Sequence, residues 1–421
     1  MGASKNADPN QPKAERVATS LLARHDLQPV SFSLEHWKPV QALWGGYGQV
    51  IAFNAEASSA KGAAYMERLL GRINGQQGSV YPLIMKIVTP PPGSQESPSE
   101  GDLRKMLSYD VEQYFYEELA TTLPGDIPVA KCVASSRTLP NQTEGSAAES
   151  QCTAMILTDL RIDFPVDFSK RQMLRLDVVY SALTWLGRFH AKSWDWLPFN
   201  PEDVVLPPLV EAQERKGRKG GRSVWRNGGY TYLETRRSEF QALQKDELSE
   251  WSAALCRPHG QHQTPAAVLA ASFLSASGRA FETYIHGDVK SENMFASKDG
   301  DQVAFYDFQY VGIGLGVSDL AKLFTCSVPQ TMLVEGDVPH RLEMQPKERA
   351  LLERYREILL ETDKAPEYEW HGFCRHWETA LVDWCRFQAS WGFWGNTEWL
   401  EARVRSILSD QGWWDWIERE A

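Results

Sequence analysis

Three oxygen-bearing side chains in the second half of the chain have the types and the spacing that phosphoryl transfer requires. The segment Y-I-H-G-D-V-K-S-E-N over residues 284–293 places Asn293 five positions after Asp288, and Asp307 follows fourteen residues later. Transfer from a nucleotide needs one carboxylate that orients and deprotonates the accepting hydroxyl. It also needs hard oxygen ligands for Mg²⁺, which an amide and a second carboxylate supply. The spacing therefore predicts Asp288 as the catalytic base and Asn293 with Asp307 as metal ligands.

The residues around these side chains predict a small β-hairpin that holds them. The sequence K-D-G-D at 298–301 is typical of a hairpin turn, and the apolar run 303–306 predicts a buried strand that ends at Asp307. Both acidic groups would then lie on loops of one hairpin, where one metal ion could bridge them. Chance spacing in an Asp-rich loop is the simpler alternative. The combination of H-G-D-x-x-x-x-N with a strand-borne D-F-Q argues against it.

These two motifs together resemble a known group of kinases. Residues 286–293 and the D-F-Q at 307–309 are similar to the catalytic loop and the metal-binding motif of the aminoglycoside phosphotransferase/choline kinase superfamily. D-F-Q resembles the ecdysteroid-kinase-like (CHK kinase-like) branch more than the branches with D-F-E, D-W-E or D-F-G. The resemblance implies an α+β, protein-kinase-like two-lobed fold, with a small β-sheet lobe carrying one main helix and a larger, mostly helical lobe. It also implies ATP- and Mg²⁺-dependent phosphorylation of a hydroxyl on a small molecule.

Within the catalytic loop and just after it, three more residues receive roles. Lys290 lies two positions beyond Asp288, as the lysine of protein-kinase catalytic loops does, and there it would face the transferring phosphate. A surface lysine on a charged loop is an equal alternative. His286 is expected to hold the loop by hydrogen bonds rather than to act as an acid or base. The resemblance suggests that Asp319, at the start of a helix, braces the catalytic loop.

Upstream, a glycine-rich segment is predicted to approach the nucleotide phosphates. Residues 40–53 read as strand, turn and strand, with Gly45, Gly46 and Gly48 in the turn. Glycines let a backbone approach phosphate groups closely, and their amides donate to phosphate oxygens. The pattern alone is weak, because many hairpins carry glycines and the sequence here is neither a P-loop nor a dinucleotide fingerprint.

A lysine on the next apolar strand, residues 81–88, predicts a further phosphate contact. If Lys86 is buried it needs an anionic partner, since an unpaired buried charge is costly. The kinase arrangement supplies the α- and β-phosphates and a glutamate from the following helix. An edge-strand lysine that points to solvent is the alternative.

That glutamate is expected from a helix over residues 108–119, with Ser108 as its cap. Val111, Phe115 and Leu119 lie on one stripe at helical spacing. The family pattern E-x-x-F-Y falls on Glu112, which makes Glu112 the first choice and leaves Glu117 in reserve.

The remaining small-lobe elements follow from the resemblance. Residues 127–133 and 152–157 are similar to the last two strands of that lobe. The hinge would come next, and its backbone at Thr158 and Leu160 would contact the adenine ring.

The sequence divides into three predicted parts: a disordered N-terminus at 1–12, an N-lobe at 13–160 and a C-lobe at 161–421. The C-lobe is expected to contain a long helix over 172–196. A Gly pair among aromatic residues at 224–233 predicts a turn packed onto that lobe, near the substrate.

The C-terminal tail is helical and rich in tryptophan, with nine of the sixteen tryptophans from Trp370 onward. One apolar stripe at helical spacing comprises Trp377, Leu381, Trp384, Phe387, Trp391 and Trp394. Such stripes are core far more often than ligand cages. In this family the acceptor site lies among large-lobe helices, so an aromatic wall would also suit a steroid-like or quaternary-ammonium substrate.

Composition narrows the class without naming a substrate. The 421 residues carry a net charge of −11, which argues against a nucleic-acid surface. The six cysteines are far apart and have no zinc spacing, as expected for reduced thiols. No apolar run is long enough to span a membrane, and no signal-peptide core opens the chain. A cytoplasmic protein with no membrane or obligate protein partner is therefore predicted.

Three functions compete at this point: a small-molecule kinase, a protein kinase and an inactive nucleotide-binding scaffold of the same fold. Too few residues separate Gln309 from Asp319 for a protein-kinase activation segment that ends in A-P-E. Competent residue types fill every catalytic position, which argues against the scaffold. Steroid, amino alcohol, aminosugar and nucleoside hydroxyls remain open as acceptors, and so does GTP in place of ATP.

Overall fold

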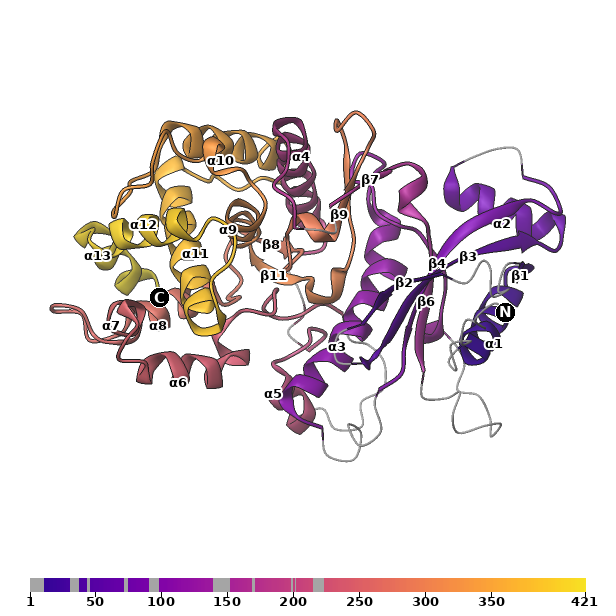
Figure 1. Cartoon of the computed structure of the whole chain (residues 1–421), viewed down its shortest axis with the longest axis horizontal. Helices are drawn as coiled ribbons and strands as arrows, with labels where there is room; N and C mark the ends of the chain where they lie inside the picture. The colour runs from indigo at the N-terminus through magenta and orange to yellow at the C-terminus, as the bar shows by residue number, and fades with distance from the viewer. Residues whose placement is uncertain are drawn as a thin grey trace, which may run out of the picture. The chain divides into compact units, whose positions relative to one another are not determined.

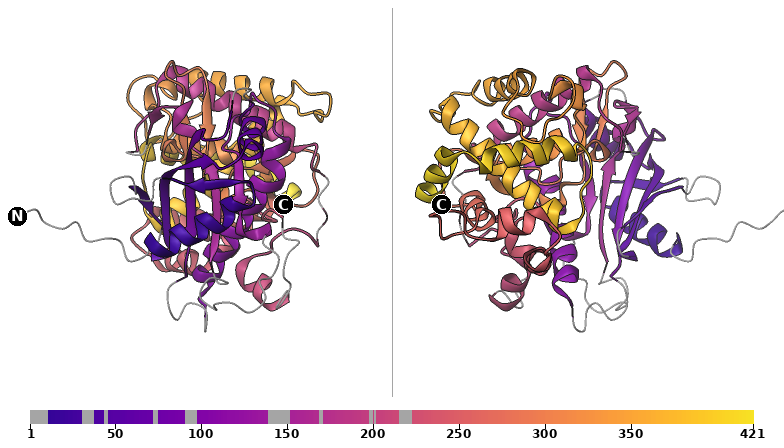
Figure 2. Two further views of the ribbon diagram at one scale, coloured as in Figure 1. Left: turned by 90° about the vertical axis from the view of Figure 1, so that its right-hand side faces the viewer. Right: turned by 60° about the vertical axis from the view of Figure 1, so that its left-hand side comes forward.

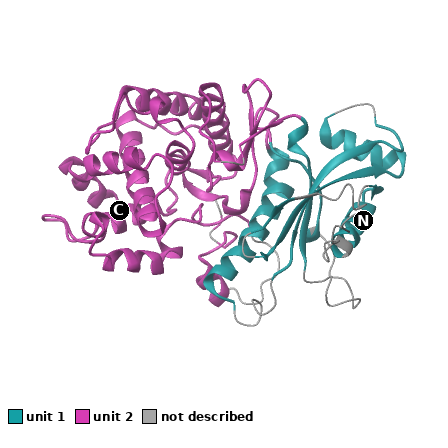
Figure 3. Cartoon of the chain, viewed as in Figure 1, with its two compact units in different colours: residues 1–122, 129–162 teal, residues 123–128, 163–421 magenta. Residues whose placement is uncertain are grey.

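The computed structural model describes residues 11–30, 38–43, 46–71, 75–90, 98–138, 152–168, 171–197, 200, 202–214 and 223–421. The chain forms two compact units, one made of residues 1–122 with 129–162 and the other of 123–128 with 163–421 (Figures 1 and 3). The first unit is built on an antiparallel sheet and the second is mostly helical, so the predicted α+β class is confirmed. Residues 1–10 and Gly45, which carried predictions, lie outside the described residues.

The sheet of the first unit has six strands: β1 Leu27–Pro29, β2 Lys38–Ala42, β3 Gly48–Ala57, β4 Val80–Val88, β5 Cys132–Ser135 and β6 Thr153–Thr158. Their order is β1-β3-β4-β6-β5, and β2 pairs with residues 49–52 of β3 on the same edge that β1 uses farther along the strand. The long strands β3 and β4 pair antiparallel along their whole length, from Gly48 opposite Val88 to Glu56 opposite Val80. Alternate β3 residues such as Ile51 are buried, as expected for a sheet with one face on the core.

Among its described residues, the first unit has three α-helices: α1 Gln11–Ala23, α2 Ala60–Leu70 and α3 Glu100–Tyr114. The helix that carries Glu112 begins earlier than predicted, because Ser99 and Asp102 form a reciprocal capping box at its start. Ser108 is therefore not the cap. It lies inside α3 and donates its hydroxyl to the Lys105 carbonyl at 2.7 Å. The helix then continues as a π-helical turn, Phe115–Leu119.

The second unit contains two small sheets. One joins β7 Val166–Asp167, β9 Met294–Ala296 and β10 Val303–Phe305, and the other pairs β8 Glu282–Ile285 with β11 Gly312–Leu315. The predicted hairpin is present, since β9 and β10 pair antiparallel with Val303 opposite Ala296. Gly300 in its turn has φ +77°, which a glycine adopts without strain. These strands place both predicted motifs at strand ends.

Helices make up most of the second unit: α4 Leu176–Ser193, α5 Pro208–Glu214, α6 Arg237–Lys245, α7 Glu250–Cys256, α8 Ala266–Leu274, α9 Val317–Cys326, α10 Pro346–Leu359, α11 Trp370–Trp391, α12 Thr397–Leu408 and α13 Gln411–Glu420. Short 3₁₀ turns occur at Ala120–Thr122, Ser136–Thr138, Leu160–Ile162, Leu233–Thr235, Ser291–Asn293, Phe308–Tyr310 and Gln330–Met332. Helix α4 is shorter than the predicted 172–196. Helix α11 packs against α8, α9 and α12, and α4 packs against α10 (Figure 2). Among the described residues, no helix combines the length and the apolar character that crossing a bilayer would need.

The tryptophan-rich tail forms much of the core of the second unit. Trp377, Trp399 and Trp413 have no exposed surface, so packing is their role as predicted. The predicted stripe ends sooner than expected, because α11 stops at Trp391 and that ring is 58% exposed. Trp394 lies beyond the helix and packs edge-on against Trp384 with 5.5 Å between ring centroids.

Candidate functional site

The loop that follows β8 is held in a shape that only glycine permits at its second residue. Gly287 has φ +86°, and a Cβ there would lie 2.3 Å from the Tyr310 carbonyl oxygen and 2.6 Å from the Gly229 amide nitrogen. Side chains other than hydrogen are therefore excluded by both conformation and space. The residue after it, Asp288, receives a fixed backbone position from this turn.

Asp319 braces the loop from the first turn of α9. Its two carboxylate oxygens accept the backbone N–H groups of His286 at 2.7 Å and Gly287 at 2.9 Å. Burial acts against the ionised carboxylate, but the hydrogen bond and charge of His190 outweigh it and lower the pKa of Asp319. His190 in turn contacts the Tyr355 hydroxyl at 2.7 Å through Nδ1. The predicted bracing role of Asp319 is confirmed.

His286 also holds the loop, as predicted. It has no exposed surface, and its Nε2–H donates to the Tyr306 carbonyl at 2.9 Å. Its Nδ1 accepts the Asp288 backbone N–H at 3.3 Å, so Nδ1 carries no proton. Burial lowers the pKa of His286 despite the carboxylates around it, which agrees with a neutral ring. A neutral histidine bonded to the backbone on both nitrogens is a structural element of the loop.

Asp288, Lys290 and Asn293 converge on one carboxylate. The Lys290 ammonium donates to both Asp288 oxygens, at 2.9 and 3.2 Å. The Asn293 amide nitrogen donates to Asp288 Oδ2 at 2.9 Å and to the Asp288 carbonyl at 2.8 Å. Burial alone would lower the pKa of Lys290, but the nearby carboxylates, that of Asp288 foremost, raise it. Both partners therefore fix the orientation of the Asp288 carboxylate.

Asp307 takes an unusual backbone conformation at the end of β10. It has φ +66° and ψ +58°, the left-handed region that non-glycine residues seldom adopt. Its carboxylate accepts the Gln309 side-chain amide at 2.6 Å, and the Gln309 carbonyl accepts the indole N–H of Trp225 at 2.8 Å. The negative charge of Asp307 also contributes to the raised pKa of Lys290, so the two motifs share one electrostatic environment.

These groups fit a hard divalent cation. The Asn293 side-chain nitrogen donates to Asp288, so its side-chain oxygen is available as a metal ligand. The Asp307 carboxylate supplies a second, anionic oxygen ligand. In the part of the chain that the structure describes, no three His, Cys, Asp or Glu side chains gather as a metal site of their own. A cation held by one amide and one carboxylate would complete its shell with water and phosphate oxygens, as Mg²⁺ does.

In the first unit, Lys86 forms a buried ion pair with Glu112. The Lys86 ammonium on β4 lies 2.6 Å from the Glu112 carboxylate on α3, and the two side chains are only 9% and 3% exposed. The reserve residue Glu117 instead binds Arg137 at 2.6 Å. The solvent-facing alternative for Lys86 is therefore wrong, and the helix partner is the residue that the sequence favoured.

In the glycine turn, one position has no room for a side chain, and a neighbouring tyrosine connects the turn to α3. A Cβ on Gly48 would lie 2.0 Å from the Ile87 carbonyl oxygen, so the pairing of β3 with β4 itself requires glycine there. Gly46 has φ +75° and open space around its Cβ position. Tyr47 is buried and donates its hydroxyl to Asp102 at 2.5 Å, which joins the turn to the start of α3.

The predicted hinge residues Thr158 and Leu160 differ in which of their hydrogen-bonding groups already have partners in the protein. The Thr158 amide donates to the Lys131 carbonyl at 3.0 Å, and the Thr158 hydroxyl accepts the Lys131 amide at 2.9 Å. The Thr158 amide is therefore not free to donate to an adenine ring, whereas its hydroxyl accepts from Lys131 and keeps its own proton to donate. Leu160 begins a 3₁₀ turn, which Asp159 stabilises by accepting the Arg161 amide at 3.0 Å.

The predicted site residues thus form two clusters, each within its own unit. Lys86 and Glu112 belong to the first, and Asp288, Lys290 and Asn293 to the second, which Asp307 influences through its charge. A model of the ecdysteroid kinase-like family matches residues 82–337, which include both clusters. The chain belongs to the ecdysteroid kinase-like family. This membership confirms the resemblance inferred from the two motifs, while the glycine turn lies outside the matched range.

This ecdysteroid kinase-like chain is also distantly similar to solved structures. The complex of amicoumacin kinase hAmiN with AMP-PNP, Ca²⁺ and Ami has 12% identity over 95% of this chain and 93% of that one, with a TM-score of 0.43. Macrolide 2'-phosphotransferase MphH from Brachybacterium faecium has 13% identity over 93% and 97%, with a TM-score of 0.41. Choline kinase from Cryptosporidium parvum Iowa II has 10% identity over 93% and 90%, with a TM-score of 0.36. No curated protein matches the sequence.

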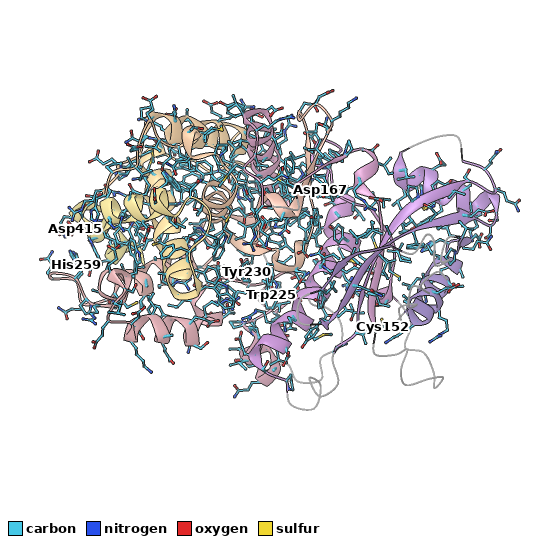
Figure 4. All side chains as sticks on the ribbon, viewed as in Figure 1. Cys152, Asp167, Trp225, Tyr230, His259 and Asp415 are labelled. Carbon is cyan, nitrogen blue, oxygen red and sulfur yellow. The ribbon has the colours of Figure 1, made fainter. Side chains whose placement is uncertain are left out.

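Sequence reasoning missed several residues that surround the site of this ecdysteroid kinase-like chain. Tyr230, labelled in Figure 4, lies in the predicted Gly-pair segment. The centroid of its ring lies 5.1 Å from that of the Tyr310 ring. Burial raises the pKa of Tyr230 well above its ordinary value, and the charge of Asp288 adds to the effect. Trp225 hydrogen-bonds the D-F-Q backbone, as described above. Their aromatic character beside a Gly pair was the available signal, but their partners are more than 75 residues away along the sequence.

Proposed function

We propose that the protein is a kinase that uses ATP and Mg²⁺ to phosphorylate a hydroxyl group of a small molecule. The observation that carries the proposal is the setting of Asp288. A rigid glycine turn and the Asp319 brace hold its backbone, and hydrogen bonds from Lys290 and Asn293 hold its carboxylate in place. An ionised, positioned carboxylate is what a hydroxyl acceptor requires of its base.

In this proposal Asp288 accepts the proton of the attacking hydroxyl. Lys290 now pairs with that carboxylate at 2.9 Å. When the hydroxyl occupies the base, the lysine could turn its charge toward the transferring phosphoryl group, where developing negative charge needs it. The ion pair with Asp288 favours a role for Lys290 in phosphoryl transfer over the alternative of a surface lysine with no function.

Asn293 and Asp307 would hold the metal through their side-chain oxygens. Bound Mg²⁺ neutralises charge on the phosphate oxygens and fixes their geometry. The Gln309 amide that donates to Asp307 at 2.6 Å orients this carboxylate and limits its rotation. The left-handed backbone conformation of Asp307 also supports a functional role, because strained backbone conformations are found more often at active and ligand-binding sites than elsewhere.

Lys86, held by Glu112, would contact the α- and β-phosphates, and the amides of Gly45, Gly46 and Gly48 would lie over the phosphate chain. The buried pair favours this, because a lysine so deeply enclosed and already oriented loses little freedom on binding. For the adenine contact, the geometry favours Leu160 over Thr158, whose amide and hydroxyl are engaged by Lys131. The proposed partner is a hydroxylated small molecule of the steroid-like, amino alcohol or aminosugar class, and the cytoplasmic location stays a prediction.

The test separates binding from transfer. Asp288→Asn removes the base but keeps the proposed metal ligands, so Mg·AMP-PNP should still raise the melting temperature as in wild type. Transfer, followed as ADP release across a panel of hydroxylated small molecules, should fall by roughly 10²- to 10⁴-fold. Asp337→Asn, an exposed aspartate of the same unit, is the matched control and should change neither quantity.

Two results would decide against the proposal. Normal turnover by Asp288→Asn would reject the base. A wild-type protein that neither responds to Mg·AMP-PNP nor releases ADP with any acceptor would favour an inactive scaffold of the same fold.

A further inference from the structure

Lys322 is a buried lysine that the proposed reaction does not use. It lies on α9, one turn after Asp319, and is only 4% exposed. Among the described residues, none is seen to form a hydrogen bond or an ion pair with its ammonium, which acts on the Asp319 carboxylate through its charge and lies 5.9 Å from the centroid of the Trp384 ring. A buried ammonium without a close partner is costly. Lys322 is therefore a candidate for binding a ligand of opposite charge.

The ammonium lies at the wall of a pocket within the second unit. This pocket has a volume of about 540 Å³, part of it open to solvent, and is bounded by residues of α8, α9, α11, the β8–β11 pair and the segment 227–233. Its enclosed part has room for a few waters, which is the size of one carboxylate or sulfate.

Hydrogen-bond donors line this pocket beside Lys322. The hydroxyls of Ser318 and Thr231 face it and have no partner among the residues that the structure describes. The Asn227 side-chain oxygen accepts the Ala276 amide at 2.9 Å, so its amide nitrogen remains as a third donor. An ammonium with neutral donors around it is the chemistry of an anion site.

Two acidic groups lie nearby, and each has a partner other than Lys322. Asp383 lines the same pocket, but its Oδ1 accepts the Arg386 guanidinium at 2.7 and 3.1 Å. Asp319 is bound by two backbone amides and faces His190, as described above. Arg386 has no exposed surface, and its charge is offset by that of Asp383, which leaves Lys322 as the positive group that lines the pocket.

The pocket adjoins the proposed catalytic loop. A Cβ placed on Gly229 would lie 3.3 Å from the Lys322 ammonium and 3.3 Å from the Gly287 carbonyl oxygen. The two groups are thus no farther apart than twice that distance, and Gly287 directly precedes Asp288. A small molecule with an anion against Lys322 would have its other end near the base.

We propose that this pocket binds an acidic group, a carboxylate, sulfate or phosphate, carried by the hydroxylated molecule that the enzyme phosphorylates. The inference rests on the proposed function and narrows its acceptor to anionic hydroxy compounds. Lys322 supplies the charge, and Ser318, Thr231 and Asn227 supply directional hydrogen bonds. If Lys322 instead has a purely structural role and only offsets the charge of Asp319, replacing it should not change the affinity of the protein for acidic ligands.

The experiment compares hydroxycarboxylic acids with their methyl esters as acceptors, in wild type, Lys322→Met and Lys322→Arg. The control is Lys298→Met, which removes an exposed lysine from the same unit. Wild type should prefer each accepted acid over its ester, and Lys322→Met should reduce that preference by roughly ten- to hundredfold, mainly through KM. Lys322→Arg should keep most of it. Lys322→Gln, which keeps a polar head without charge, replaces the methionine variant if that one does not fold.

A second arm measures melting temperature without nucleotide, with the same acids and with sodium sulfate. Stabilisation by acids but not by sulfate, lost in Lys322→Met, supports the acceptor as the source of the anion. Stabilisation by sulfate alone indicates a free anion and overturns the assignment to the acceptor. An acid preference that survives in Lys322→Met, or no stabilisation by any anion, overturns the site. If acids bind through Lys322 but none is phosphorylated, the pocket stands and the proposed kinase function fails.

Discussion

Replacing Asp319 with asparagine should show how much of the second unit's stability depends on the brace of the catalytic loop. The carboxylate accepts two backbone N–H groups, at 2.7 and 2.9 Å, with no exposed surface. An asparagine offers one oxygen, so its amide nitrogen must face one of these donors. Hydrogen bonds to a charged group contribute about 1.5–3 kcal/mol each, and a buried unpaired donor costs about 1–3 kcal/mol. We expect the free energy of unfolding to fall by about 3 kcal/mol.

Tryptophan fluorescence during urea unfolding is the suitable assay. Of the sixteen tryptophans, all but Trp37 and Trp44 lie in the second unit, so the signal reports that unit. Asp337→Asn is the control and should change stability by less than about 0.5 kcal/mol, as surface substitutions usually do. A loss below about 1 kcal/mol in Asp319→Asn would refute the bracing argument.

The same pair of proteins makes a prediction about pH. The pKa of Asp319 is lowered in the folded state, so its stabilisation is complete above the ordinary aspartate pKa of about 3.9 and is lost as the pH falls through the folded pKa. The stability difference between wild type and Asp319→Asn should therefore be constant from about pH 7 to 5 and shrink below about pH 4. A difference that grew on acidification would contradict the sign of this shift.

Variants of Asp307 test the proposed metal ligand, and variants of Lys86 and Glu112 test the buried ion pair of the first unit. Asp307→Gly should raise the free energy of unfolding by about 0.5–1 kcal/mol over Asp307→Ala, because glycine adopts the left-handed conformation without strain. Both variants should lose the Mg²⁺-dependent part of nucleotide stabilisation, and equal stability of the two would show that the backbone is unstrained. Lys86→Met should destabilise the first unit by about 3–5 kcal/mol, since it removes the ammonium of this ion pair while the Glu112 carboxylate stays buried. Adding Glu112→Gln should recover much of this loss in thermal unfolding, and a double variant as unstable as the single one would contradict the reasoning.

The parts of the site that sequence could predict are those with local spacing. Asp288 and Asn293 lie five residues apart in one loop, so a single turn brings them together regardless of the rest of the fold. The choice of Glu112 followed from helical periodicity, which survives even though the helix starts at Glu100. The true cap, Ser99 with Asp102, is an S-x-x-D pattern that was readable from the sequence.

Other features depend on contacts that no local pattern encodes. The partners of Asp319 come from α4 and from the loop after β8, far away in sequence. Thr158 was predicted to contact adenine, and the structure adds that its amide and hydroxyl bond to Lys131, which directly precedes the neighbouring strand β5. The position of Lys322 at a pocket depends on helices α8, α9 and α11 and strands β8 and β11, which pack together only in the folded unit.

The short segment 123–128 has a consequence for biosynthesis and for attempts to divide the chain. It belongs to the second unit although the first unit resumes at residue 129. The Pro128 carbonyl accepts the indole N–H of buried Trp185 at 3.0 Å, and Asp126 pairs with Arg188 at 3.2 Å. On the ribosome this segment emerges well before α4, so it must wait for its partners while the first sheet is still incomplete. A fragment that begins at residue 163 would leave the Trp185 donor without its acceptor, and one that begins at residue 123 would carry strands torn from the first sheet.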